Sequence, residues 1–215
     1  MLLSELKFGS YLTYTPRPNS DEGKYAKNYV NSIKMEIGIP TDPPLFMSDR
    51  VAKNIKAGID ETPLKDFFGR DVALVPVPKS SLMQLNSLWV PLKLATAFSK
   101  EGFGTCYPCL ERKNPVNKAS YSKPENRPKA IDHYKSIKLK MTLQKPKKII
   151  LIDDVVTRGS TLLGCASLLQ ESFPGTPIIG FAVVRTISDP DNFKKMVEPC
   201  IGKITRNGDD TFRVP

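Results

Sequence analysis

Three short runs of consecutive aliphatic residues place the strongest constraint on the fold of this chain. They occur at residues 71–78 (DVALVPVP), 147–153 (KKIILID) and 176–184 (TPIIGFAVV). A strand that is apolar at every position has no polar face for water, so other elements must cover both of its faces. Such strands are typical of parallel sheets, whose crossover connections place helices on both sides. The three runs therefore predict the middle strands of a mainly parallel sheet.

Segments with a helical or strand-like pattern lie between these runs. Residues 87–102 and 160–172 carry apolar residues at helical spacing. Residues 104–112 are expected to form a further strand, and residues 135–140 a short edge strand. This alternation of strands and helices predicts an α/β core with a doubly wound, mainly parallel sheet at residues 71–186.

The rest of the chain is expected to add small elements to this core and not a second domain. The 215 residues, 40% of them hydrophobic, suffice for one sizeable core but not for two ordinary domains. Residues 1–70 are expected to form an N-terminal helical appendage, a candidate hood, with helices at about 21–36 and 49–58. Residues 187–215 are expected to form a small, irregular C-terminal tail or flap.

The composition excludes several classes of protein. No stretch is long and apolar enough to span a membrane, and the first ten residues lack the pattern of a signal peptide. Four cysteines do not make a disulfide framework in a chain of this length, and the lone C-x-x-C at residues 106–109 supplies too few ligands for a zinc site. We therefore expect a cytoplasmic protein without a membrane partner and without a metal site made of protein ligands alone.

The segment that points most directly to chemistry follows the second aliphatic run. Asp153 and Asp154 end the expected strand, and TRGST at residues 157–161 leads into the next helix. Gly159 permits a tight turn in which successive amides point inward, and such a nest at a helix N-terminus binds phosphate. Because carboxylates repel phosphate, the two acids suit the hydroxyls of a sugar beside it. Ligands of open α/β sheets bind at this place, beyond the carboxyl ends of the strands.

Positive charge is concentrated in the segment before this site. The formal net charge of the chain is +10, and residues 111–148 contain twelve Lys or Arg against three acids. The part from 112 to 130 is rich in proline and has no periodic pattern, so we expect a long mobile loop. Three interpretations remain open for it: a lid over a polyanionic ligand, a nucleic-acid surface, or an ordinary solvated surface.

The residues IILIDDVVTRGST (149–161) resemble the 5-phosphoribosyl-1-pyrophosphate (PRPP) motif of type I phosphoribosyltransferases, and twelve of the thirteen positions fit. The exception is Arg158, where the usual pattern has Thr; it would contact the phosphate or pair with an acid. The resemblance implies that Asp153 and Asp154 hold the ribose hydroxyls and that the following loop cradles the 5′-phosphate. The ligand-binding residues that it implies are Val155, Val156, Thr157, Arg158, Gly159, Ser160 and Thr161.

A second resemblance lies at residues 75–81, VPVPKSS. Type I phosphoribosyltransferases have a pyrophosphate-binding loop after the first core strand, which implies this role for Lys79, Ser80 and Ser81. A strand that simply ends in prolines would explain Pro76 and Pro78 equally well.

The order of these motifs across residues 71–186 is most similar to the competence protein F branch of the superfamily. In that branch the long loop carries arginines near the positions of Arg112 and Arg127. The chain departs from the branch in having no cysteine before residue 106, and so no N-terminal zinc module. It also has MQLNSLW (83–89) in place of an Arg-Gly-Phe-Asn element. Membership of the superfamily is therefore better supported than membership of the branch.

The resemblance implies transfer of a phosphoribosyl group from PRPP to a nitrogen nucleophile, with release of pyrophosphate. It implies Asp153, Asp154, Arg112 and Arg127 as catalytic residues and Mg²⁺ as the cofactor, because charge develops on both the sugar and the leaving group. The expected ligands are PRPP or a nucleoside 5′-monophosphate, and a homodimer is compatible with the fold. The sequence does not identify the acceptor, which would be a base or an amine.

Two other classes of function remain open. One is a regulator that senses PRPP or a nucleotide without turnover, and the other is a nucleic-acid-associated protein in DNA uptake or phage defence. His133, the only histidine, is expected to be a packed or solvated loop residue and not a general base.

Overall fold

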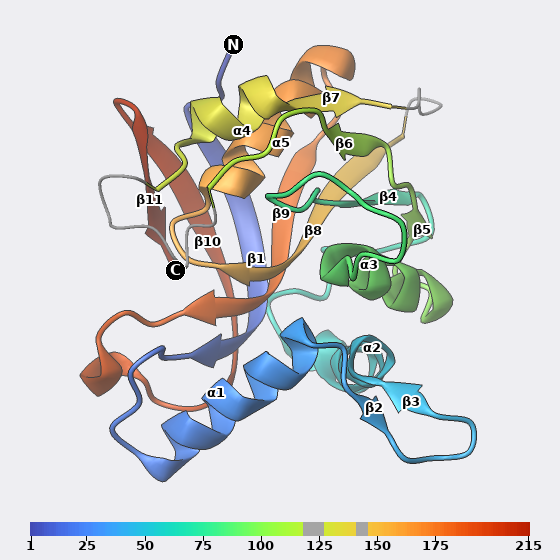
Figure 1. Ribbon diagram of the computed structural model, residues 1–215, viewed down its shortest axis with the longest axis vertical. Coiled ribbons are helices and arrows are strands. Elements are labelled where there is room, and N and C mark those ends of the chain that lie inside the picture. Colours follow the sequence, from blue (N-terminus) through green and yellow to red (C-terminus); the bar gives the residue numbers. More distant parts are fainter. Residues whose placement is uncertain (118–126, 141–145) are drawn as a thin grey trace.

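The computed structural model describes residues 1–117, 127–140 and 146–215. A seven-stranded sheet with strand order β11-β10-β1-β9-β8-β4-β5 forms its centre (Figure 1). Five strands run parallel to one another: β1 (Glu5–Tyr14), β9 (Ile178–Thr186), β8 (Lys148–Val156), β4 (Val72–Pro76) and β5 (Thr105–Cys106). The other two, β10 (Val197–Asn207) and β11 (Asp210–Val214), form an antiparallel hairpin at one edge. The sheet is thus mainly parallel, as predicted.

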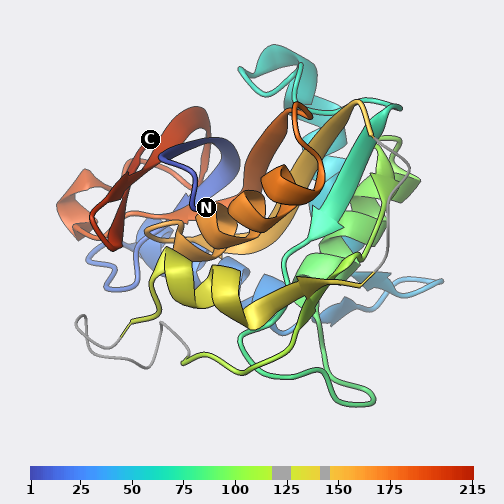
Figure 2. The ribbon, with the colours of Figure 1, turned by 90° about the horizontal axis from the view of Figure 1, so that it is seen from above.

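Helices cover both faces of this sheet, which confirms the doubly wound α/β class. Three pack on one face, α1 (Asp21–Lys34), α2 (Met47–Gly58) and α3 (Val90–Lys100), and two lie on the other, α4 (Ala130–Ser136) and α5 (Ser160–Ser172). Along β8 the buried residues alternate between the two cores: Ile150 and Ile152 face α1–α3, whereas Ile149 and Leu151 face α5. Figure 2 shows α4 lying against α5, with the C-terminal hairpin beside them.

Short elements complete the described part of the chain. These are the two-stranded sheets β2 (Gly38–Ile39) with β3 (Leu45–Phe46) and β6 (Leu110–Arg112) with β7 (Ile137–Leu139), and the 3-10 helices η1 (Ile59–Glu61) and η3 (Pro190–Asn192). Within these described ranges no helix has the length and apolar character needed to cross a membrane.

The N-terminal segment differs from the expected helical appendage. The two helices are present as α1 and α2, but β1 precedes them and lies inside the sheet between β9 and β10. The alternation typical of a half-buried strand is broken in β1 because Ser10 and Thr13 are buried polar residues. The boundary expected at residue 70 therefore does not separate an appendage from the sheet.

Two further elements differ from the sequence-based expectation. The C-terminal segment is not irregular, because β10 and β11 extend the sheet; only Gly202 and Ile204 of β10 are buried, so its apolar pattern is faint. The single strand expected at residues 104–112 is divided into β5, which joins the large sheet, and β6, which pairs with β7. Pro108 lies between them and has no N–H for continued pairing.

Candidate functional site

A cavity of about 790 Å³ opens at the carboxyl ends of the parallel strands. Its lining comes from segments that are far apart in the sequence but adjacent in the sheet, as the strand order requires. The residues at or just after the strand ends are Tyr14, Pro16 and Arg17 of β1, Thr186 and Ser188 of β9, residues 153–162 from β8 to α5, and Ser80 after β4. The others are Lys34, Asn117, Arg127, Pro128 and His133.

The turn between β8 and α5 has the backbone geometry of an anion site. Gly159 lies at the N-cap of α5 with φ 86° and ψ 10°, in the left-handed region that favours glycine. No side chain caps this helix, although the first N–H groups of any helix need an acceptor. Residues 157–161 thus present a helix N-terminus to the cavity, where the helix dipole also favours an anion.

Gly159 is needed for a second reason, the close approach of the C-terminal hairpin. A Cβ atom at this position would lie 2.5 Å from Cδ1 of Ile204 on β10. Ile204 is fully buried, and its branched side chain has few alternative rotamers. The turn and the hairpin therefore pack without room for one additional carbon atom.

Strand β11 holds the same turn through side-chain contacts. The contacts join Arg158 Nη1 to Asp210 (2.9 and 3.0 Å), Ser160 Oγ to Thr211 Oγ1 (2.7 Å), and Arg213 Nε to the Thr157 carbonyl oxygen (2.8 Å). Two roles were expected for Arg158, a contact with the phosphate or a pair with an acid. In the structure it pairs with an acid, Asp210. The side chains at 158 and 160 are engaged with the hairpin, which leaves the backbone amides as the donors on the cavity side.

The two acids lie beside this turn, where Asp153 is buried and Asp154 is partly buried. Asp153 is 9% exposed, and its Oδ1 accepts a hydrogen bond of 2.9 Å from the N–H of Asp154. Burial raises the pKa of Asp153 well above its usual value, the adjacent charge of Asp154 raises it further, and Lys34 acts weakly in the opposite direction. Such a pair favours a ligand that brings positive charge or hydroxyl donors.

Arg112 does not line the cavity, although it was a predicted catalytic residue. It is 3% exposed, and its guanidinium group lies behind the loop that follows β4. Its donors reach the Lys79 carbonyl oxygen (2.8 Å), Ser136 Oγ (2.5 Å), the Pro78 carbonyl oxygen (3.5 Å) and His133 Nδ1 (3.3 Å). Arg112 therefore fixes the backbone of residues 78–79 from the inside.

His133 connects Arg112 to the turn after β8. It is 6% exposed on α4, and α4 approaches α5 closely at Gly164, where a Cβ would lie 2.7 Å from His133 Cβ. Because arginine has only donors, Nδ1 of His133 must accept, so the proton is on Nε2, 3.4 Å from Thr161 Oγ1. Burial and the charge of Arg112 lower the pKa of His133 to about 4. The imidazole is therefore neutral at pH 7.

The remaining predicted site residues are divided between the cavity and its surroundings. Ser80 and Arg127 line the cavity, whereas Lys79 and Ser81 do not. Residues 118–126 of the expected lid lie outside the described part of the chain, but Asn117, Arg127 and Pro128 on either side of that gap line the cavity. In the described ranges no three His, Cys, Asp or Glu residues are grouped as a metal would require.

Several residues of the site were not singled out in the sequence. Tyr14, Arg17 and Lys34 line the cavity from the N-terminal segment. Residues 14 and 17 would have been found if β1 had been identified, because the carboxyl end of a parallel strand lies at the ligand edge of the sheet. The hairpin residues that support the turn come close to it only because distant strands pair. No local pattern in the sequence therefore identifies them.

The pKa of His133 leads to a prediction about acid stability. Because it falls from an ordinary 6.5 to about 4 on folding, neutral His133 contributes stability above pH 6.5 that is lost as the pH falls towards 4, roughly 3 kcal/mol in total. His133→Gln, which keeps an amide in place of the imidazole, should lack this loss. Urea unfolding between pH 7 and 4 should therefore show a steeper decline for the wild type. Parallel profiles would contradict the assignment, since the titration of Asp153 is common to both proteins.

Comparison with known proteins yields structural likeness only. The sequence matches no protein-family model and no curated protein. The structure is similar to a hypoxanthine phosphoribosyltransferase from Staphylococcus aureus in two crystal forms. For the tetragonal form the identity is 14% and the TM-score 0.34, over 70% of this chain and 68% of that chain. For the orthorhombic form the identity is 16% and the TM-score 0.34, over 78% and 75%. Likeness at this level carries no argument about function.

Proposed function

We propose that the cavity binds PRPP or a nucleoside 5′-monophosphate and that the protein is a cytoplasmic phosphoribosyltransferase. The observation that supports this most is the presence, in one cavity, of two adjacent acids, the buried Asp153 and the partly buried Asp154, directly beside an uncapped helix N-terminus. A phosphate ester next to vicinal hydroxyls satisfies both groups at once, since the backbone N–H groups donate hydrogen bonds to the phosphate and the carboxylates accept hydrogen bonds from the hydroxyls.

The strand order supports one orientation of the donor. The 5′-phosphate would occupy the turn at residues 157–161, and the ribose hydroxyls would contact Asp153 and Asp154. The pyrophosphate would then lie towards Ser80, because β4 is the neighbour of β8 on that side. Arg112 acts here as a positioning residue: by binding the carbonyl oxygens of residues 78 and 79 it leaves the N–H side of that loop free for the leaving group.

The residues fit a Mg²⁺ ion that arrives with the donor. Mg²⁺ in phosphate sites is held by one or two carboxylates together with substrate oxygens and water, so the absence of a three-ligand cluster among the described residues is compatible with it. Asp153 and Asp154 are the residues that would hold it, directly or through the ribose hydroxyls. When bound, the ion would neutralise charge on the departing pyrophosphate.

Binding of the donor should raise the melting temperature. At a hundredfold excess over Kd, a ligand adds about 2.7 kcal/mol to the free energy of unfolding, which corresponds to roughly 5–10 °C for a chain of this size. We expect this shift with PRPP and Mg²⁺, a smaller one with ribose 5-phosphate, and a still smaller one with 2-deoxyribose 5-phosphate, which lacks one of the two hydroxyls. Scanning fluorimetry measures all three.

The same experiment distinguishes the proposal from its alternatives. No shift at millimolar PRPP would refute the donor site. Stabilisation by PRPP without pyrophosphate release in the presence of any acceptor would instead favour the regulator that binds without turnover. Equal shifts with the two sugar phosphates would mean that the acids do not contact the diol.

A further inference from the structure

The order of the strands places the two ends of the cavity on opposite sides of the acid pair, one beside β4 and the other beside β1. Ser80 follows β4 at one end. The acid pair near the end of β8 and the turn at residues 157–161 lie in the middle. Tyr14 at the end of β1 and Arg17 after it lie at the other end, beyond β9. A nucleophile that displaces a leaving group from a sugar carbon approaches the opposite face of the ring. If pyrophosphate leaves towards Ser80, the acceptor must lie at the β1 end.

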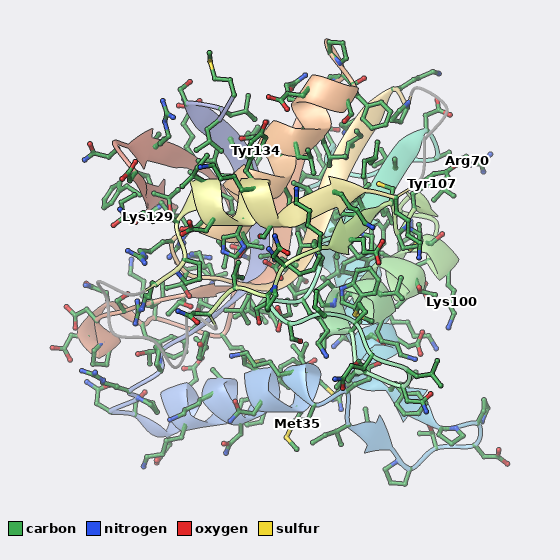
Figure 3. The ribbon with its side chains drawn as sticks, turned by 45° about the horizontal axis from the view of Figure 1, so that its top comes forward. Met35, Arg70, Lys100, Tyr107, Lys129 and Tyr134 are labelled. Carbon is green, nitrogen blue, oxygen red and sulfur yellow. The ribbon has the colours of Figure 1, made fainter. Side chains whose placement is uncertain are left out.

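The β1 end of the cavity is positively charged. Lys34, the last residue of α1, has its Nζ 5.4 Å from the centroid of the Tyr14 ring and is near enough to Asp153 to influence its pKa. Figure 3 locates this end of α1 by Met35, whose exposed side chain points away from the body of the protein. Arg17 is exposed in the segment after β1. Within the described ranges neither Arg17 nor Lys34 forms an ion pair.

Neither binding of the donor nor stabilisation of α1 accounts for both Arg17 and Lys34 at this end of the cavity. A lysine in the last turn of α1 is favoured by the helix dipole, but Arg17 lies outside any helix. The carboxylates in the described lining are Asp153 and Asp154, which the ribose would occupy. The pyrophosphate would lie at the loop after β4, on the far side of the acid pair from the two cations. A neutral acceptor would offer Arg17 and Lys34 no anionic group to bind, while the carboxylates of the described lining would be engaged with the ribose.

We propose that the acceptor is a planar nitrogen compound that carries a carboxylate or similar anionic group, which Arg17 and Lys34 bind while the Tyr14 ring packs against its plane. This inference rests on the function proposed above. In the reaction the C1–O bond breaks and its electron pair leaves with pyrophosphate. The nitrogen lone pair of the acceptor forms the C1–N bond, and any proton on that nitrogen passes to solvent.

Matched acceptors test the proposal. Pyrophosphate release with PRPP and Mg²⁺ is measured for nicotinate against nicotinamide, orotate against uracil, and anthranilate against aniline. We expect the acid of at least one pair to have a kcat/KM at least tenfold above that of its neutral partner. Lys34→Gln should lower that kcat/KM at least tenfold and change the KM for PRPP less than threefold. Lys53→Gln, an equal loss of charge on the exposed surface of α2, should change neither.

Three outcomes would overturn the inference while leaving the donor site intact. They are stabilisation by PRPP with no reaction of any of the three acids, a neutral partner that reacts as fast as its acid, and a loss in Lys34→Gln that is equal for acid and neutral acceptors. A protein that PRPP does not stabilise would refute the proposed function itself and the acceptor inference with it.

Discussion

Replacing Gly159 with Ala should destabilise the protein by about 2–5 kcal/mol and abolish the shift produced by PRPP. The left-handed backbone costs a residue with a Cβ roughly 1–2 kcal/mol, and forcing an extra carbon into a packed region costs typically 1–3 kcal/mol. The new Cβ would meet Cδ1, Cγ1 and Cγ2 of Ile204 at 2.5, 2.6 and 2.9 Å. Relief requires the turn or β10 to move, and either movement alters the arrangement of the amides. Urea unfolding and scanning fluorimetry with PRPP measure the two effects.

The chain provides a matched control for this substitution. Gly175 has a similar φ of +78°, but nothing lies within 4 Å of the Cβ that an alanine would add. Gly175→Ala should therefore show the backbone cost alone and keep the PRPP shift. Adding Ile204→Ala to Gly159→Ala should restore part of the ligand response by removing the clashing atoms. If Gly159→Ala behaves like Gly175→Ala, the close packing of turn and hairpin does not support the site.

The double substitution Asp153→Asn with Asp154→Asn should have opposite effects on binding and on stability. The whole PRPP shift of roughly 5–10 °C should disappear, and kcat/KM should fall at least 10³-fold, since both proposed ribose contacts are lost. Without ligand, however, the variant should be as stable as the wild type or more so at pH 7. The reason is that burial and mutual repulsion raise the pKa of Asp153, so its ionised form is a cost to the native state as the pH rises.

Asp60 and Glu61 supply the control, since they are adjacent acids on the exposed surface of η1. Asp60→Asn with Glu61→Gln removes the same charge and should leave the PRPP shift unchanged. A double variant at 153 and 154 that still responds fully to PRPP would show that the acids do not hold the ribose. One that unfolds would show that they support the native structure.

The central part of the fold could be predicted because its signals are local. β4, β8 and β9 are continuous apolar runs, and the helix expected at 160–172 is α5 (Ser160–Ser172). β1 was missed because Ser10 and Thr13 fill buried positions that a pattern assigns to apolar residues. The hairpin was missed for the opposite reason, since little of it is buried.

The same distinction applies to the site. The acid pair and the turn are contiguous in the sequence, so a motif identified both as candidates. The inward position of Arg112 and its contact with His133 depend on the pairing of β6 with β7, which brings residues of the basic segment behind the loop after β4. The support of Thr157 by Arg213 joins residues 56 positions apart. Charge and residue type did not reveal these contacts, because they arise only when distant elements pack.

The position of β1 also bears on how the protein is made. β1 is synthesised before its partners β9 and β10, which begin roughly 160 and 180 residues after β1 ends. At about 5–20 residues per second a ribosome needs roughly 10–40 s to supply them. During that time Leu6, Phe8 and Leu12, all buried in the finished sheet, have no strand to pair with. The turn that carries Gly159 likewise receives its support from β11, which is synthesised after the other described strands of the sheet. The proposed donor site is therefore complete only after β11 has been synthesised.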